Sequence, residues 1–151
     1  SVIFHMIDEL GYSVDEVKSL LQEKSGMLGL TGYSDLREIE TAASQGDEAC
    51  NLALKMNAYR VKKYIGAYTA AMNGLDALVF TAGIGENSDL LRSLICADMG
   101  FFGIHLDEDK NRVREHSIRE IQTDGAEVSL LVVPTNEELE IAKQSFGLLS
   151  S

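Results

Sequence analysis

Two short apolar runs constrain the fold of this chain more than any other feature. Residues 75–81 and 128–133 are nearly all apolar, and each has the length of a strand. A strand that is apolar on both faces is typical of the buried middle of an α/β sheet. Residues 119–123 and 127–133 can also form a hairpin across a turn at Asp124 and Gly125. The pattern predicts one α/β domain that covers the whole chain.

Helical periodicity accounts for most of the remaining sequence. Residues 2–10 have the spacing of a helix, and Ser13 with Glu16 forms a capping-box pattern that starts a second one. The glycine-rich residues 27–32 are expected to form a buried, close-packed connector. The longest predicted helix covers residues 47–73, and its apolar seam recurs every three or four residues: Leu54, Ala58, Val61, Ile65, Tyr68 and Met72. That seam either packs against a sheet of the same domain or takes part in subunit association.

Charge and composition argue against several classes of function. The net charge of −11 disfavours a protein that binds nucleic acid or a membrane surface, because both need a positive surface potential. No apolar run approaches the ~20 residues of a membrane span, and no signal peptide opens the chain. Cys50 and Cys96 have neither metal-ligand nor disulfide spacing. We expect both in the core of a protein from a reducing, cytoplasmic compartment.

The segment after the first predicted strand is a candidate ligand site. Ligands of open α/β sheets bind beyond the carboxyl ends of the strands, and Gly83 and Gly85 remove side chains where the chain has to turn. A helix that begins at Ser88 would present unpaired N–H groups to phosphate or ribose oxygens, while Glu86 and Asn87 add an acceptor and an amide. A tight turn without a ligand is the alternative, since the segment matches neither a Walker A loop nor a complete dinucleotide fingerprint.

The second predicted strand ends at a similar junction. Thr135 and Glu138 have capping-box spacing, which gives Glu138 a structural role. Glu137, at the start of the last helix, has no part in this capping box. Glu137 either interacts with the helix dipole or binds Mg²⁺. This ion typically takes one or two protein carboxylates together with phosphate oxygens and water.

A third candidate lies at the start of a short helix predicted to run to about Ser44. Asp35 either caps this helix or holds a ribose hydroxyl, and Arg37 is either solvated or contacts an adenine or a phosphate group. The histidines share no spacing with one another or with a serine or cysteine nucleophile: His5, His105 and His116. The sequence therefore predicts no hydrolase triad.

Several stretches of this sequence resemble the acetate kinase family. They are residues 23–32 (EKSGMLGLTG) with 34–37 (SDLR), residues 59–68, residues 80–88 (FTAGIGENS) and residues 133–139 (VPTNEEL). They occur in the family's order and spacing, and together they cover nearly the whole chain. One departure is Leu36, which stands where a larger side chain is common.

The resemblance implies a fold, a set of ligands and a set of site residues. The family has two ribonuclease H-like lobes of the actin, Hsp70 and sugar kinase superfamily, with the nucleotide held between them. This chain is similar to the C-terminal lobe, a central mixed sheet flanked by helices. By the same resemblance Glu137 binds Mg²⁺, and family members are homodimers joined through this lobe. The residues implied to contact ATP or ADP are Asp35, Leu36, Arg37, Gly83, Ile84, Gly85, Glu86 and Asn87.

The same resemblance implies what this part of the family lacks. The acetate pocket, the arginines and histidine of the transition state and a phosphate loop lie in the N-terminal lobe, which is absent here. We therefore expect no catalytic residue in this fragment. The function expected of the whole protein is reversible transfer of the γ-phosphoryl group of ATP to acetate, which yields acetyl phosphate and ADP. A propionate or butyrate kinase is the alternative within this class, and a free-standing dimerisation or nucleotide-binding module is the non-enzymatic one.

Overall fold

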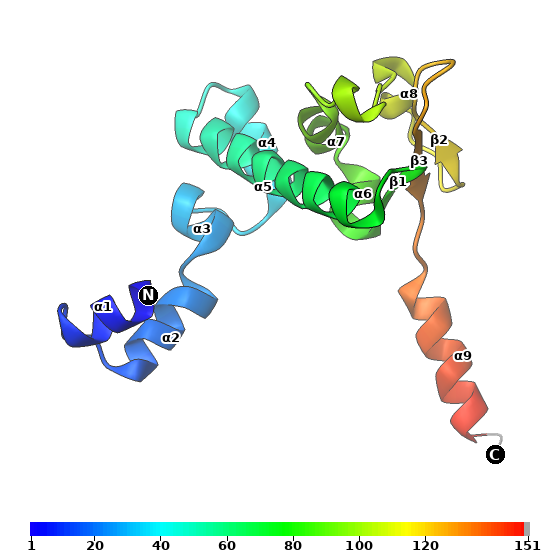
Figure 1. The fold of residues 1–151 in the computed structure, drawn as a ribbon. Helices are drawn as coiled ribbons and strands as arrows, with labels where there is room; N and C mark the ends of the chain where they lie inside the picture. The colour runs from blue at the N-terminus through cyan, green and yellow to red at the C-terminus, as the bar shows by residue number, and fades with distance from the viewer. Residues whose placement is uncertain (150–151) are drawn as a thin grey trace. The chain divides into compact units, whose positions relative to one another are not determined.

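The chain divides into two compact units, Ser1–Asn57 and Ala58–Ser151. The computed structural model describes residues 1–149, apart from the side chain of Glu137. Figure 1 shows the order of the helices and strands along the chain. Because the chain divides in this way, we describe each unit by itself, and the single domain expected from the sequence stays a prediction.

The first unit is helical, and local sequence signals start its helices as expected. It holds α1 (Val2–Asp8), α2 (Val14–Glu23), α3 (Gly26–Thr31), α4 (Leu36–Ser44) and the beginning of α5 (Glu48–Met72). The capping box at α2 is confirmed, since Glu16 N–H donates to Ser13 Oγ at 3.2 Å and Ser13 N–H donates to the Glu16 carboxylate at 2.8 Å. Two orphan donors of the first helical turn are thereby satisfied.

The prediction of a buried connector over residues 27–32 is wrong. Most of this stretch belongs to helix α3, and Leu28 and Leu30 are exposed by 39% and 45%. Gly29 and Gly32 do not prevent the short helix, because Gly32 serves as its left-handed C-cap, with φ of 80°. Apolar composition alone could not distinguish a buried segment from an exposed helical turn.

Leu54, Ala58 and Ile65 of the predicted seam in helix α5 are buried. Within the first unit, Cys50 and Leu54 are buried, and Asn51 Nδ2 donates to the Ala43 carbonyl of α4 at 3.0 Å. Farther along the helix Tyr68 and Met72 are exposed by 61% and 62%. For the last two turns this exposure disfavours packing within the chain, and subunit association, the other expectation for the seam, stays a prediction.

The second unit is built on a three-stranded mixed sheet with strand order β1–β3–β2. Its strands are β1 (Ala77–Thr81), β2 (Arg119–Glu120) and β3 (Ser129–Val133), with β1 parallel and β2 antiparallel to β3. The register pairs Thr81 with Val133, so β1 and β3 end side by side. The α/β class with a mixed sheet and flanking helices is confirmed, and so is the antiparallel pairing expected of the hairpin.

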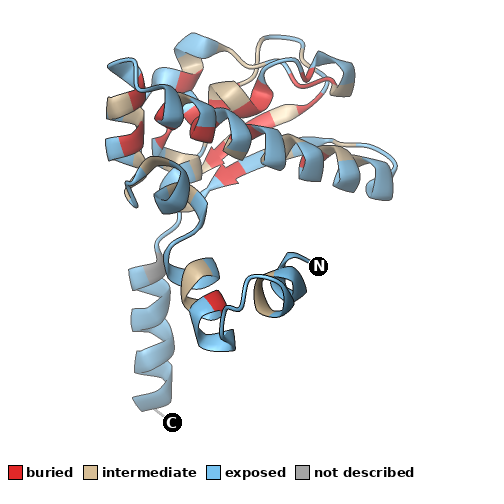
Figure 2. Ribbon diagram, turned by 90° about the vertical axis from the view of Figure 1, so that its left-hand side faces the viewer, coloured by how far each residue is buried: buried red, intermediate tan, exposed pale blue. Residues whose placement is uncertain are grey.

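Strand β3 is the buried centre of this sheet, as its apolar sequence predicted. Leu130 and Val132 are fully buried, and Figure 2 shows buried residues on the strands as well as on the helices. The same expectation is wrong for β1, which lies at an edge of the described sheet. Only Phe80 of β1 is buried, and Val79 is exposed by 49%.

Short helices complete the second unit. They are α6 (Ala82–Asn87), α7 (Asp89–Cys96), the 3₁₀ turn η1 (Gly100–Phe102), α8 (Glu108–Arg112) and α9 (Glu137–Leu149). Helix α7 turns Leu91 and Ile95 into the core. Apolar residues of α9 are exposed, with Leu139 at 50% and Phe146 at 73%. Within residues 1–149, no helix is both long and apolar enough to cross a membrane.

Candidate functional site

The glycine-rich segment after β1 folds as a helix rather than as an open loop. The chain leaves Thr81 through Ala82, whose φ of 58° is left-handed, and then forms α6 over Ala82–Asn87. Helix α7 begins separately, with Leu91 N–H donating to the Ser88 hydroxyl at 3.0 Å. The expectation that the glycines form an open turn before one helix at Ser88 is corrected: they form a helix of their own. Because α6 contacts both β1 and β3, it still lies at the carboxyl ends of the two parallel strands.

The two glycines of α6 differ in the space around them. A Cβ at Gly85 would lie 3.1 Å from the carbonyl carbon of Phe80, a backbone atom that cannot easily move. A Cβ at Gly83 would meet no atom within 4 Å. Gly85 is thus required for the close approach of α6 to β1, whereas Gly83 leaves open space in front of the backbone.

Glu86 connects α6 to the segment that follows β3. Its Oε1 accepts hydrogen bonds from Thr135 N–H at 2.8 Å and from the Thr135 hydroxyl at 2.9 Å. The backbone hydrogen bond from Thr135 is the largest cause that lowers the pKa of Glu86 below its ordinary value. The two junctions singled out in the sequence are therefore joined by one carboxylate.

The predicted capping box of Thr135 with Glu138 is wrong. Thr135 donates its hydroxyl to Glu86, and the cap of α9 is instead Asn136, whose Oδ1 accepts from Leu139 N–H at 2.9 Å. Asparagine is among the best N-cap residues, and a cap at Asn136 places Glu137 at the first position of α9. The side chain of Glu137 lies outside the described part of the structure.

Asp35 and Arg37 lie in the first unit and are joined to each other. Asp35 caps α4 by accepting from Arg37 N–H at 2.9 Å, and Arg37 Nε and Nη2 donate to the same carboxylate at 3.0 and 2.5 Å. The hydrogen bond from the Arg37 side chain lowers the pKa of Asp35 to about 2. The structure confirms the cap, and the exposed guanidinium is held in one orientation beside Leu36.

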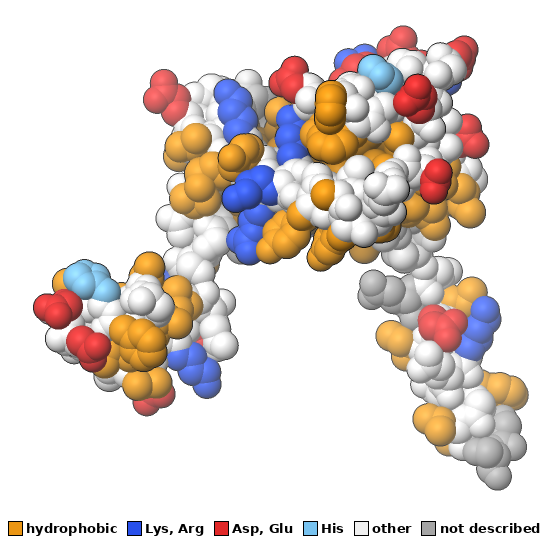
Figure 3. Space-filling view, viewed as in Figure 1, with side chains coloured by type: hydrophobic (Ala, Val, Ile, Leu, Met, Phe, Trp, Pro, Cys, Tyr) orange, Lys and Arg blue, Asp and Glu red, His pale blue; other side chains and the backbone are white. Residues whose placement is uncertain are grey.

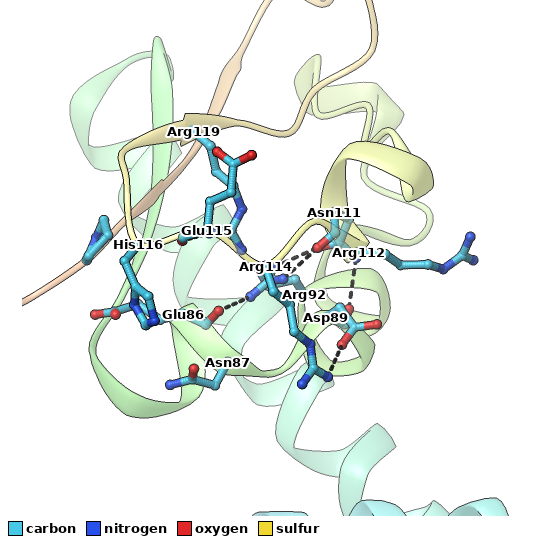
Figure 4. Close-up of a pocket in the computed structure, with 11 residues that line it drawn as sticks. Glu86, Asn87, Asp89, Arg92, Asn111, Arg112, Arg114, Glu115, His116 and Arg119 are labelled. Atoms are coloured by element: carbon cyan, nitrogen blue, oxygen red, sulfur yellow. Dashed lines mark hydrogen bonds and ion pairs between the residues drawn. The ribbon is translucent and has the colours of Figure 1, made fainter.

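Sequence reasoning missed two buried polar residues behind α6, Arg92 and Asn111. They are exposed by 2% and 0%, and they lie in the wall of a polar cavity of about 140 Å³ beside α6 (Figure 4). Burial and the nearby Arg119 lower the pKa of Arg92. A signal was present in the sequence: Ser88, Arg92 and Ile95 recur at helical spacing, so Arg92 stands within the inward stripe of α7.

Comparison with known proteins shows the family of this chain. The profile of the acetokinase family matches residues 1–143. The chain belongs to the acetokinase family. An acetate kinase from Flavobacterium johnsoniae is 61% identical over all 151 residues, which make up 38% of that protein. The chain therefore spans well under half the length of this acetokinase relative.

Solved acetokinase structures share the fold as well as the sequence. The crystal structure of Porphyromonas gingivalis acetate kinase is 42% identical, has a TM-score of 0.87, and is matched over 98% of this chain and 37% of that one. A propionate kinase from Francisella tularensis is 38% identical with a TM-score of 0.84, over 93% of this chain and 36% of that one. The fold seen here is thus that of one part of an acetokinase.

Proposed function

We propose that the protein containing this chain is an acetate kinase, which transfers the γ-phosphoryl group of ATP reversibly to acetate to form acetyl phosphate and ADP. The observation that carries the proposal is the 61% identity with an acetate kinase over the full chain. The geometry is compatible with it, because two parallel strands end side by side and the residues that follow them are bonded to each other.

In this proposal the chain binds the nucleotide, and residues elsewhere in the protein carry out phosphoryl transfer. Asp35, Leu36 and Arg37 in the first unit and residues 83–87 in the second contact ATP or ADP, mainly through its adenosine part. Open space in front of Gly83 supports an approach of the ligand to the α6 backbone. Phosphoryl transfer depends almost wholly on positioning and on stabilisation of charge, so holding the nucleotide still is a direct contribution to the rate.

Glu137 is proposed as the one Mg²⁺ ligand of this chain. Its place at the start of α9 fits a single carboxylate ligand of Mg²⁺, an ion whose other ligands would be phosphate oxygens and water. Among the described side chains, no group of three or more His, Cys, Asp or Glu residues could hold a metal by itself. When bound, the ion would neutralise phosphate charge.

Replacing Glu137 by Gln in the whole protein tests this assignment. We expect kcat to fall by about two orders of magnitude or more, because charge stabilisation in phosphoryl transfer is lost. The melting temperature should stay close to that of the wild type, and Glu138→Gln is the matched control on the same helix turn. Near-normal turnover by Glu137→Gln would return this carboxylate to a structural role at the helix start.

Propionate is the second candidate acceptor, because a propionate kinase shares 38% identity and the same fold with this chain. Steady-state assays of the whole protein with ATP and acetate, propionate or butyrate separate the candidates. We expect the highest kcat/KM with acetate. A preference for propionate would replace the acceptor in the proposal, and ATP consumption that depends on none of these acids would overturn it.

We also propose that the whole protein is a homodimer that operates in the cytoplasm. Support for the dimer comes from the exposed aromatic residues of α5, which include Tyr64 and Tyr68.

Support for the compartment comes from Cys50 and Cys96, which are both buried free thiols. Burial raises the pKa of Cys96 to about 12, so this thiol stays protonated and unreactive.

A further inference from the structure

Arg92 of helix α7 uses its guanidinium to hold the end of helix α6. Its Nη1 donates to the Gly85 carbonyl at 2.7 Å and to the Glu86 carbonyl at 2.9 Å. Both carbonyls belong to the last turn of α6, where backbone acceptors lack the partners that a longer helix would give them. A cation at this end of a helix is also favoured by the helix dipole.

Asn111 of helix α8 fixes the guanidinium in this position. Arg92 Nε donates to Asn111 Oδ1 at 2.7 Å, and Arg92 Nη2 donates to the Asn111 carbonyl at 2.8 Å. The amide of Asn111 is anchored in turn, since Nδ2 donates to the Asp89 carbonyl at 2.9 Å and to the Ser93 hydroxyl at 3.0 Å. Figure 4 shows Arg92 between Glu86 on one side and Asn111 on the other.

This arrangement requires an arginine for geometric reasons. The planar guanidinium carries donors on two sides of a rigid fork, so it can reach α6 and Asn111 at once. A lysine ammonium is one point of charge and cannot reproduce four bonds to acceptors on two elements. Every acceptor of Arg92 described here is a neutral carbonyl or amide oxygen, so the group is held by directed hydrogen bonds rather than by an ion pair.

The contacts continue from Arg92 to the start of helix α9. Arg92 fixes the backbone of Glu86, and the Glu86 carboxylate holds Thr135 two residues before Glu137. One buried side chain thus sets the place of two segments that follow different strands. Displacing the end of α6 would move both segments together.

We propose that Arg92, oriented by Asn111, is a positioning residue that sets the geometry of the nucleotide-binding helix α6 and, through Glu86, of the segment that presents Glu137. The inference rests on the proposed function, since it assigns a role within the same site. Arg92 itself is 2% exposed and acts through Gly85 and Glu86 rather than on the ligand.

A positioning role and a purely structural role predict different kinetics. If Arg92 only stabilises the fold, its replacement lowers the fraction of active enzyme, which reduces kcat and leaves the KM for ATP unchanged. If Arg92 positions α6, the folded variant binds the nucleotide in a displaced site. Because the displaced groups make weaker contacts with the nucleotide, the KM for ATP should rise by roughly tenfold or more.

The test measures Arg92→Lys and Asn111→Ser in the whole protein, with Lys62→Met as the control. Lys62 is a matched control, because its ammonium donates to the Ala97 carbonyl at the end of α7, in the same unit but away from α6. We expect both test variants to raise the KM for ATP at least tenfold and to leave the KM for acetate within about twofold. Lys62→Met should change neither KM.

An unchanged KM for ATP in a folded Arg92→Lys variant overturns the inference. Should Arg92→Lys fail to fold, Asn111→Ser decides by the same criterion, because it keeps the arginine and removes the side-chain amide that accepts from Arg92 Nε. Failure of the proposed function is distinguishable: the wild type would then show no acetate-dependent ADP formation. In that case the dissociation constant for Mg-ATP, measured by calorimetric titration, takes the place of KM. Equal dissociation constants for wild type and variant refute the positioning role.

Discussion

At the scale of single residues, the two glycines of α6 show how one motif combines two physical roles. Gly85 lies against the backbone of Phe80, while Gly83 faces open space. The sequence presents them as equivalent, since both are glycines beside a predicted strand end. Only the distance to Phe80 separates the glycine needed for packing from the glycine that faces open space.

Alanine substitutions at these glycines should therefore separate stability from nucleotide binding. Gly83→Ala should keep or raise the free energy of unfolding by up to about 0.5–1 kcal/mol, because alanine favours the helix, yet raise the KM for ATP by blocking the backbone. Gly85→Ala should lower the free energy of unfolding by about 1–3 kcal/mol through overpacking. Denaturant titration and ATP kinetics on both variants measure these effects. A Gly83→Ala protein with normal ATP kinetics would argue against ligand contact at this backbone.

The Glu86 carboxylate should contribute a pH-dependent part of the stability. Its pKa is lowered in the folded state, so the ionised form stabilises the fold above the ordinary pKa of 4.5. That contribution is lost as the pH falls through the lower folded pKa. The difference in free energy of unfolding between wild type and Glu86→Gln should therefore be largest at neutral pH and shrink below about pH 4.5. A difference that does not change between pH 7 and pH 3 would show that the carboxylate charge is not involved.

At the scale of elements, helix α5 contains a surface that its own unit does not cover. Tyr64, Tyr68 and Met72 are each more than half exposed and lie on one side of the helix, since successive steps of four residues rotate by only about 40°. The rings of Tyr64 and Tyr68 are stacked, with centroids 6.2 Å apart. Figure 3 shows hydrophobic side chains along α5 next to Lys and Arg side chains. Aromatic residues of this kind are enriched in protein interfaces.

Replacing Tyr68 by lysine should weaken the proposed homodimer. A charge at the centre of an apolar contact is costly to desolvate, so Tyr68→Lys should shift the whole protein toward monomer in light scattering. Tyr59→Lys is the matched control, because Tyr59 is on the opposite side of α5 and is similarly exposed, at 65% against 61%. If both variants stay dimeric at micromolar concentration, the dimer contact does not include this part of α5.

The strands illustrate why position within a sheet was not readable from composition. Residues 75–81 and 128–133 looked alike, and both were expected in the sheet centre. In the structure β3 has partners on both sides, whereas β1 has its described partner on one side only. Pairing is a property of two segments at once, so the number of partners depends on which other strands are present.

At the scale of the whole molecule, the nucleotide site proposed for this chain would be one part of the active site of the proposed acetate kinase. The chain corresponds to 38% of the acetate kinase from Flavobacterium johnsoniae. Its most buried cation, Arg92, is occupied by backbone and amide oxygens rather than presented to a ligand. Catalysis of phosphoryl transfer requires cationic groups around the transferring phosphate.

The isolated chain should therefore bind Mg-ATP weakly at best and form no acetyl phosphate. Trapping of acetyl phosphate as its hydroxamate, with the whole protein as the positive control, measures this directly. A folded sample, verified by circular dichroism, is needed for the comparison. Acetyl phosphate production by the isolated chain above the background of heat-treated protein would contradict the expectation.

Local chemistry explains which elements the sequence predicted correctly. Ser13 with Glu16 and Asp35 act on donors within three residues, so their capping roles were readable from spacing. Thr135 was predicted to cap in the same way, yet it bonds to Glu86, which is 49 residues away. A carboxylate distant in the sequence can take the Thr135 hydroxyl away from a local cap only when the fold brings the two residues together.

The sequence by itself determined the α/β class, the starts of α2 and α4, the central strand β3 and the family, because these depend on periodicity, on neighbouring residues and on motifs long enough to be specific. Tertiary structure alone decided that Glu86 holds Thr135 and so leaves the cap of α9 to Asn136, that Gly85 and not Gly83 packs on Phe80, and that a buried arginine holds the end of α6. The physical reason is range: hydrogen bonds and close packing act over a few ångströms in space, between residues whose separation along the chain carries no trace of their contact.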